Sequence, residues 1–143
     1  MFAKQLTVFI ENRTGRLCEV LNVLKESNVN LLSMSLADTT EFGLLRLIVN
    51  DPVRGKEKLT EKGFSSLLSD VSIIKIPHKV GSLQELLKDI DQNGVNIEYM
   101  YGLSIEAEDA YVVLKASDIN KADTILANAG IETISNDQLA KMQ

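Results

Sequence analysis

The chain of 143 residues is long enough for one ordinary domain or two very small ones. Its net charge of −5 argues against binding to nucleic acid, because contacts with phosphates require clustered Lys and Arg. The single cysteine, Cys18, excludes an internal disulfide and a multi-cysteine metal site, and no apolar run approaches the ~20 residues of a membrane span, so we expect a cytoplasmic protein.

The first half of the chain predicts strands and helices in the order β-α-β-β-α-β. Residues 1–5 lack a signal-peptide core and lead into an alternating pattern that indicates a strand. Apolar residues from Leu17 onward recur at the spacing of an amphipathic helix, and Pro52 and Gly63 suit the start and end of a second one. In chain order we expect a strand over 6–10, a loop over 11–15, a helix from 17 that stops at 27–28, strands over 29–36 and 42–49 with a turn at 38–41, a helix from 52 to 63 and a strand over 64–68.

The second half of the chain predicts the same order. A loop at 77–81 precedes a helix with the same apolar spacing, and Gly130 is expected to cap a later one. In chain order we expect a strand over 71–76, a helix from 83 that ends at 93–94, strands over 95–103 and 110–116, a helix over 119–129, a closing strand over 131–135 and a tail over 136–143.

The two halves are copies of one another. A shift of 66 positions aligns Gly15 with Gly81 and Asn30 with Asn96, and the shift becomes 67 after one added residue near position 40. This period is longer than the roughly 20–50 residues of solenoid repeats. We therefore expect an α+β protein of two tandem ferredoxin-like units, over 1–69 and 70–143. Because almost no linker separates them, we expect the units to pack side by side in a fixed relation, as a pseudo-dimer.

The loop before the first helix strongly resembles the turn of an ACT domain. It reads Glu-Asn-Arg-Thr-Gly-Arg-Leu at 11–17, and Asn-Val-Asn-Leu follows the helix at 28–31. The second half reads His-Lys-Val-Gly-Ser-Leu at 78–83 and Gly-Val-Asn-Ile at 94–97. The resemblance covers nearly the whole chain as two tandem copies without a catalytic domain. It implies the ferredoxin-like fold and a regulatory module that binds an amino acid.

Four positions depart from the family pattern. Thr14 and Val80 replace the usual proline of the turn, so we expect less rigid loops. Ile10 and Ile76 stand where the serine-sensing members carry a histidine, which argues against serine as the ligand.

The start of each first helix has the chemistry to hold a free amino acid. The first turn of a helix presents N–H groups without intrahelical partners, which together with the helix dipole favour a carboxylate. Gly15 and Gly81 allow a close approach of the backbone. The side-chain amides of Asn12 and Asn30 can accept from an ammonium group and donate to a carboxylate.

The resemblance further implies two sites, in each of which the turn of one unit faces the Val-Asn strand of the other. Because Asn12 and His78 hold matching positions, we expect the two sites to differ in affinity. We expect neither a metal nor a cofactor in them. The implied ligand-binding residues are Asn12, Arg13, Thr14, Gly15, Arg16, Leu17 and Asn96 in one site, and His78, Lys79, Val80, Gly81, Ser82, Leu83 and Asn30 in the other.

Plainer explanations stay open for several of these residues. The glycines can serve only as strand-to-helix turns, and the asparagines can bond only the local backbone. Cys18 is expected to pack beside Leu17. Tyr99 and Tyr101 suit either the pocket or an interface strand.

Some strands also have a second apolar face. Leu44, Ile48, Tyr111 and Val113 lie on the side of their strands opposite the residues that should face the helices. This pattern predicts further burial, including burial against another chain in a homodimer.

The leading hypothesis is a regulatory, allosteric protein that binds an amino acid or a related small zwitterion at the interface of its two ACT units. The alternative is a regulatory subunit of a separately encoded amino-acid biosynthetic enzyme, such as acetolactate synthase, that acts mainly by protein contact. An enzyme is disfavoured, because the sequence has no Ser-His-Asp set, metal cluster or phosphate-loop motif. A phosphate-bearing ligand stays open through Arg13, Arg16 and Lys79. The sequence does not select one amino acid.

Overall fold

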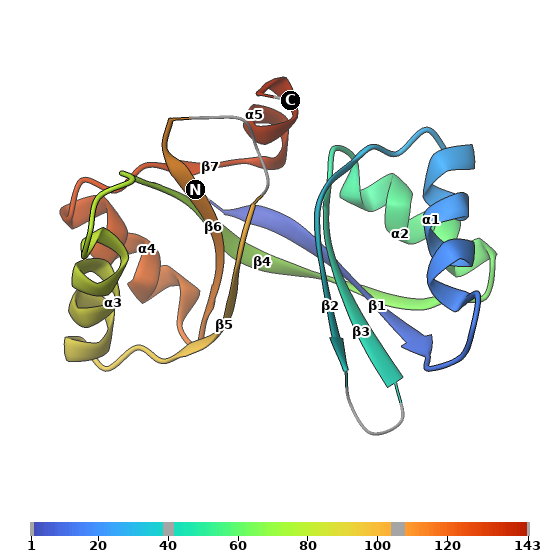
Figure 1. Ribbon diagram of the computed structural model, residues 1–143, viewed down its shortest axis with the longest axis horizontal. Coiled ribbons are helices and arrows are strands. Elements are labelled where there is room, and N and C mark those ends of the chain that lie inside the picture. The colour runs from blue at the N-terminus through green and yellow to red at the C-terminus, as the bar shows by residue number, and fades with distance from the viewer. Residues whose placement is uncertain (1, 39–41, 104–107, 143) are drawn as a thin grey trace.

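The computed structural model describes residues 2–38, 42–103 and 108–142 as helices packed on antiparallel sheet (Figure 1). The strands are β1 (Ala3–Glu11), β2 (Leu31–Asp38), β3 (Phe42–Val49), β4 (Ser65–Ile76), β5 (Ile97–Gly102), β6 (Ala110–Ala116) and β7 (Thr133–Ile134). The helices are α1 (Arg16–Glu26), α2 (Pro52–Glu61), α3 (Ser82–Gln92), α4 (Ile119–Asn128) and α5 (Asn136–Lys141). The predicted α+β order is therefore confirmed in both halves of the chain.

The strand order is the same in both repeats. It is β2-β3-β1-β4 in the first repeat and β5-β6-β4-β7 in the second, and all neighbours are antiparallel. Matching residues hold matching places, since Phe9 lies opposite Leu44 and Lys75 lies opposite Tyr111. The repeated sequence thus builds the ferredoxin-like unit twice.

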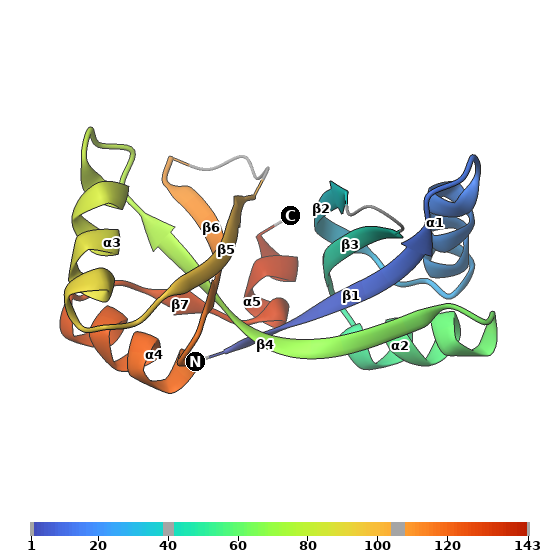
Figure 2. The same cartoon turned by 90° about the horizontal axis from the view of Figure 1, so that it is seen from below.

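One long strand serves both repeats (Figure 2). Residues 65–71 of β4 pair with β1, and residues 72–76 pair with β6. The expectation of two separate strands over 64–68 and 71–76 is wrong, because β1 pairs with β4 across the expected break and keeps its backbone extended. The expected boundary between residues 69 and 70 lies inside β4.

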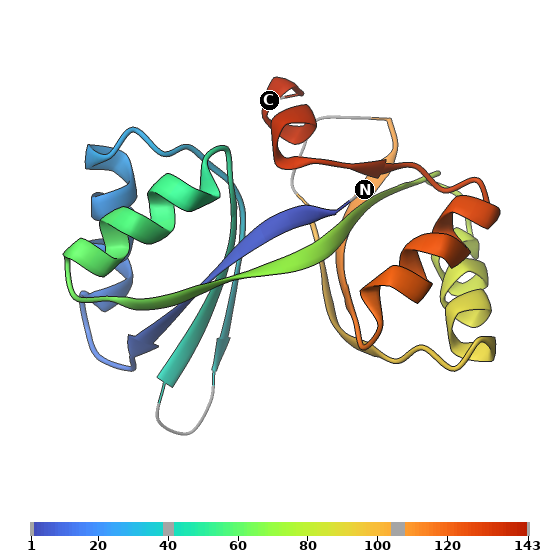
Figure 3. The same cartoon turned by 180° about the vertical axis from the view of Figure 1, so that it is seen from behind.

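Each repeat has a core between its two helices and one face of its sheet. In the first repeat, α1 and α2 cover a face that includes the fully buried Leu6 and Leu45. In the second repeat, α3 and α4 cover a face that includes the fully buried Ile74 and Leu114. Helices α1 and α2 lie on one outer side of the molecule, and α3 and α4 lie on the other (Figure 3). Burial of these two apolar faces supplies the main stabilising term for each unit.

The opposite faces of the two sheets meet in a third core. Ile48 and Val113 are fully buried there, and Tyr111 is nearly so. The predicted second apolar face is therefore buried at these positions, and the burial occurs within one chain. The third core joins residues of both repeats and so fixes their relation.

Polar side chains continue this contact between the repeats. Gln5 of β1 is completely buried. Its Nε2 donates to the hydroxyl of Tyr99 at 2.6 Å, and its Oε1 accepts from the hydroxyl of Tyr101 at 2.8 Å. The guanidinium of Arg46 lies 3.7 Å from the centre of the Tyr99 ring. The two tyrosines therefore belong to the interface between the repeats.

Residues 136–141 form the helix α5, so the expected tail over 136–143 is wrong for its described part. The Ser135 hydroxyl accepts from the N–H of Gln138, and the Gln138 side chain accepts from the N–H of Ser135. This capping box starts α5, and Leu139 of α5 is fully buried in the third core. A segment this short shows little periodicity, which is why the sequence pattern did not indicate it.

A second set of contacts fastens α5 to the first repeat. The side chain of Asn136 accepts from the backbone N–H of Lys4 at 2.8 Å and donates to the backbone carbonyl oxygen of Lys4 at 2.9 Å. It also donates to the carbonyl oxygen of Val49 at 2.9 Å. The last helix of the second repeat is therefore bound to two strands of the first.

Candidate functional site

The loops before α1 and α3 each end in a glycine with a left-handed backbone. Gly15 has φ +90° and Gly81 has φ +87°. A Cβ at either position would meet no atom within 4 Å, so the backbone angle and not the lack of space requires glycine. Both glycines stand directly before the first residue of a helix.

Glycine at these positions adds no side-chain acceptor at the starts of α1 and α3, where the N–H of Arg16 donates to the carbonyl of Arg13 at 3.4 Å and that of Ser82 to the carbonyl of Lys79 at 3.1 Å. A glycine has no side chain that can accept from the N–H groups of the first turn. The other helices are capped by side-chain oxygens of Asp51, Asp118 and Ser135. At the two helix starts that are predicted to bind a carboxylate, the capping residue therefore has no side-chain oxygen that would compete with the carboxylate for the N–H groups.

A cavity of about 180 Å³ lies beside the first of these turns, and we call it the first-turn cavity. Its volume is below the ~300 Å³ at which pockets for drug-sized ligands begin, and it suits a small metabolite. Its lining combines apolar side chains of β1, β2 and α1 with polar groups of the turn and of the ends of β1 and β2. The lining residues are Ile10, Glu11, Asn12, Arg13, Leu17, Leu36, Ala37, Asp38 and Gly43.

The first-turn cavity carries charges of both signs. Arg13 Nε donates to Glu11 Oε2 at 2.8 Å, and this hydrogen bond lowers the pKa of Glu11 below its usual value. Asp38 of β2 supplies a second carboxylate to the lining. An arrangement with a guanidinium and two carboxylates around an apolar pocket matches the chemistry of a zwitterion.

Sequence reasoning did not identify Leu36, Asp38 and Gly43 as site residues. They come from β2 and β3, and the register of the sheet brings them to the turn. A Cβ on Gly43 would lie 3.2 Å from Ile10 Cγ1 and 3.4 Å from Leu36 Cδ1, so glycine leaves room between two cavity walls. A glycine inside the apolar run of β3 was the available signal.

Arg16 and Cys18 lie outside the first-turn cavity. Arg16 Nη1 donates to Glu19 Oε2 at 2.6 Å, and its guanidinium stacks 4.3 Å from the ring centre of Phe64. Cys18 is exposed, so the expectation that it packs is wrong. The buried side of α1 is formed by other residues, with Val20 at its centre.

The second turn repeats the backbone conformation of the first, but the cavity beside it is different. His78, Lys79, Val80 and Gly81 are all exposed, as are the matching residues 12–15. Ser82 lines a cavity of about 230 Å³ beside the start of α3, together with Ile76, Pro77, Glu85, Leu86, Asp89, Ala129 and Ile131.

The reason for this second cavity is visible in the repeat. The positions that match Arg16 and Phe64 hold Ser82 and Ile131. The pair of Arg16 and Phe64, which stack in the first repeat, is therefore replaced by two smaller side chains in the second. The two turns are therefore flanked by different cavities, and the expected difference in affinity stays a prediction.

Asn30 and Asn96 lie away from the turns. The N–H of Asn30 donates to Asn50 Oδ1 at 2.8 Å, and the N–H of Asn96 donates to Ser117 Oγ at 3.0 Å. Asn30 lines a separate cavity at the other end of α1. Two perpendicular views place the turn before α1 and the segment before β5 in opposite halves of the molecule (Figures 1 and 2). The chain by itself does not bring the first turn to the Val-Asn segment of the other repeat, because β4 sets the repeats end to end.

A family model described as an ACT domain pair matches residues 1–143. The chain belongs to this family. The ACT pair is similar to the protein BT0572 from Bacteroides thetaiotaomicron, with 36% identity, a TM-score of 0.91, and coverage of 97% of this chain and 96% of that one. No curated protein matches its sequence.

More distant solved structures share the fold. The ligand-free regulatory subunit of aspartate kinase from Thermus thermophilus has 17% identity and a TM-score of 0.61, with coverage of 88% of the ACT pair and 91% of that chain. The corresponding subunit from Thermus flavus has 16% identity and a TM-score of 0.61, with coverage of 89% and 90%. These likenesses establish the ferredoxin-like tandem architecture of the ACT pair.

In the described part of the ACT pair, no helix is long and apolar enough to cross a membrane. Within the same residues, no group of three His, Cys, Asp or Glu side chains is placed to hold a metal ion.

Proposed function

We propose that this ACT pair is a cytoplasmic regulatory protein, without a catalytic site of its own, that binds a free amino acid in the first-turn cavity. The observation that carries the proposal is a helix start capped by glycine next to a small cavity of mixed charge. Membership in a family of regulatory domains supports the absence of catalysis.

The first-turn cavity offers a place for each part of an amino acid. The carboxylate would accept from the N–H groups at the start of α1 and from Arg13. The ammonium group would donate to Asp38 or to Asn12, and an aliphatic side chain would pack on Leu17 and Leu36. This packing and these hydrogen bonds are enough to supply a binding free energy of ~4–8 kcal/mol, which corresponds to a millimolar to micromolar dissociation constant.

The second turn is the matching, weaker site in this proposal. Its residues His78 to Leu83 repeat the helix-start geometry, but the cavity beside them is lined by the carboxylates of Glu85 and Asp89 and by no Lys or Arg. The proposal uses the turn residues of both repeats and gives the first turn the higher affinity. It assigns no ligand contact within one chain to Asn30 or Asn96.

Thermal-shift and calorimetric screening against the twenty amino acids tests the proposal. A ligand present at 100 times its dissociation constant should stabilise the protein by about 2.7 kcal/mol. Arg13→Ala should weaken binding of that ligand about tenfold, because a charge-assisted hydrogen bond is lost. Lys79→Ala, its match in the second turn, is the control and should leave the tighter site unchanged. Failure of all twenty amino acids, or equal effects of both variants, would contradict the proposal.

A second candidate function is that of a regulatory subunit for a separately encoded enzyme of amino-acid synthesis. Its support is that a protein of the same fold and nearly the same extent is described as the regulatory subunit of aspartate kinase. Affinity purification from the native host should recover a biosynthetic enzyme in stoichiometric amount. Recovery of the ACT pair alone, in the presence and absence of its amino acid, would reject this candidate.

A further inference from the structure

The first repeat has a second cavity, which is lined by three of the four phenylalanines of the chain. Phe9, Phe42 and Phe64 come from β1, β3 and the residue before β4, and they line a space of about 360 Å³ that we call the aromatic cavity. Among the described residues that line it, only Glu11 also lines the first-turn cavity. Its volume lies in the ~300–1,000 Å³ range of small-molecule sites.

Arg16 brings a positive charge to the aromatic cavity. Its guanidinium lies 4.3 Å from the ring centre of Phe64, within the range of a cation–π contact, and its side chain is only 18% exposed. Arg16 Nη1 donates to Glu19, which is half exposed, whereas Arg16 Nε is covered and has no hydrogen-bond partner among the described residues. Because covered donors are nearly always paired, this guanidinium has unused capacity for an acceptor.

The two outer rings are open to water. Phe9 is 37% exposed and Phe42 is 48% exposed, whereas Phe64 is buried behind Arg16 at 5% exposure. Aromatic rings pack favourably on one another in offset or edge-to-face arrangements. A flat ring that enters the aromatic cavity would therefore find aromatic surface that the protein itself leaves partly uncovered.

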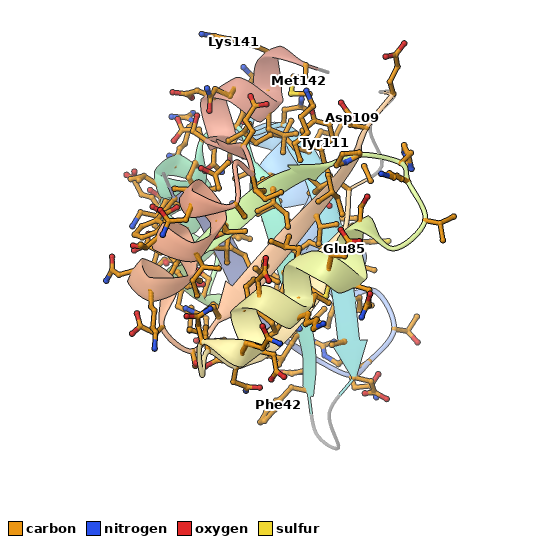
Figure 4. All side chains as sticks on the ribbon, turned by 90° about the vertical axis from the view of Figure 1, so that its left-hand side faces the viewer. Phe42, Glu85, Asp109, Tyr111, Lys141 and Met142 are labelled. Atoms are coloured by element: carbon orange, nitrogen blue, oxygen red, sulfur yellow. The ribbon has the colours of Figure 1, made fainter. Side chains whose placement is uncertain are left out.

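The second repeat shows that the fold does not require this arrangement. The matches of Phe9, Arg16, Phe42 and Phe64 are Lys75, Ser82, Asp109 and Ile131. Lys75 Nζ lies 3.2 Å from a carboxylate oxygen of Asp109, so an ion pair stands where the first repeat has two rings. Figure 4 shows Phe42 and Asp109 at opposite edges of the molecule. The gathering of three rings and a guanidinium is therefore particular to the first repeat.

We propose that the aromatic cavity binds a flat aromatic carboxylate that carries no amino group. Its ring packs on Phe9 and Phe42, and its carboxylate accepts from Arg16, whose mostly buried position strengthens the bond. An ammonium group would find one carboxylate in the lining, Glu11, which already accepts from Arg13 at 2.8 Å. This site is separate from the first-turn cavity and does not depend on the function proposed for it.

A matched series of three probes tests the chemistry of the site. Calorimetric titration should give 3-phenylpropionate a dissociation constant of about 1 mM or lower. The uncharged 3-phenylpropanol and the cationic 3-phenylpropylamine should bind at least ~tenfold more weakly, because they lose the charge-assisted hydrogen bond to Arg16. Absence of 3-phenylpropionate binding at about 10 mM, or equal binding of the alcohol or the amine, would overturn the proposal.

Arg16→Ser tests the guanidinium. The second repeat begins α3 with Ser82 at the matching position, so this variant should fold. It should weaken binding of 3-phenylpropionate at least ~tenfold and remove the preference for the acid over the alcohol. Lys25→Ser, which removes a positive charge from the last turn of the same helix, should leave both dissociation constants unchanged. An Arg16→Ser variant that keeps the native preference for the acid would refute the role of Arg16.

Nuclear magnetic resonance of the native chain locates the ligand without any variant. Nuclear Overhauser contacts should join the ring protons of 3-phenylpropionate to those of Phe9 and Phe42. Phenylalanine in about tenfold excess should not displace this ligand, since its ammonium group has no free partner in the aromatic cavity. Contacts with Leu17 and Leu36 instead would place the probe in the first-turn cavity, and displacement by phenylalanine would show that the site takes amino acids. Either result would contradict the proposal.

Discussion

At the scale of single residues, Gln5 is one of the polar groups that join the two repeats. It is fully buried, and its side chain bonds the hydroxyls of Tyr99 and Tyr101 from the other repeat. A buried amide is costly unless it is hydrogen-bonded, and here both ends of the amide have partners. The amide of Gln5 therefore helps to position Tyr99 and Tyr101 relative to the first repeat, together with the stacking of Arg46 on Tyr99.

Replacement of this amide should be strongly destabilising. Gln5→Leu leaves two tyrosine hydroxyls without their partner and should lower the free energy of unfolding by about 2–4 kcal/mol in urea titrations. Adding Tyr99→Phe and Tyr101→Phe to it removes the stranded hydroxyls and should recover part of the loss. A triple variant as unstable as Gln5→Leu alone would show that packing and not hydrogen bonding explains the effect.

Tyr101 should make the protein sensitive to alkali. Burial raises the pKa of its hydroxyl well above the ordinary value of about 10, with Tyr99 adding to the rise and Arg46 opposing it. In the unfolded chain the hydroxyl ionises near pH 10, so the unfolded state binds fewer protons there and stability falls as the pH rises further. The slope from this group approaches 1.4 kcal/mol per pH unit.

Urea unfolding of Tyr101→Phe beside the native chain measures this slope. The difference in unfolding free energy between the native chain and the variant should be constant below about pH 9 and should narrow above about pH 10. If the two plots of unfolding free energy against pH stayed parallel, the Tyr101 hydroxyl would have the same pKa in the folded and the unfolded state.

At the scale of elements, α5 acts as a fastener between the repeats. Its side chain Asn136 bonds Lys4 and Val49, and Leu139 fills the third core. A helix of six residues has little stability in isolation, so its order comes from these contacts.

Loss of the Asn136 amide should therefore lower the unfolding free energy of the whole protein. Asn136→Ala removes three hydrogen bonds and leaves the buried Val49 carbonyl without this donor, which should cost about 2–3 kcal/mol of unfolding free energy. Asn120→Ala, on the exposed side of α4, should change it by less than about 0.5 kcal/mol. Equal effects in calorimetry would exclude a specific role for Asn136.

The elements divide clearly into those that sequence predicts and those that it does not. Apolar spacing and turn residues are local signals, so the four longer helices and most strands were predictable. The unbroken β4 was not, because its middle is polar and only pairing with β1 holds it extended. The two strand-register shifts, near Leu32 and near Glu98, likewise depend on partners distant in sequence.

At the scale of the whole molecule, the candidate site could be predicted in part. The turn residues Asn12, Arg13 and Leu17 were accessible from sequence, and they line the first-turn cavity. The wall formed by Leu36 and Asp38 was not, because it depends on strand register. The pairing of each turn with the opposite Val-Asn segment depends on how the repeats are placed, and a repeated sequence carries no information about that placement.

The sharing of β4 also decides how the molecule can come apart. Residues 65–71 complete the sheet of the first repeat, and residues 72–76 form an inner strand of the second, so each repeat holds one end of a common strand. If one of the two sheets unfolds, its part of β4 loses its pairing partners. The rest of β4 is then held extended at one end less firmly, which weakens the other sheet. The two repeats should therefore unfold as one cooperative unit. A fragment that ends at residue 69 would cut through β4, the strand on which both repeats depend.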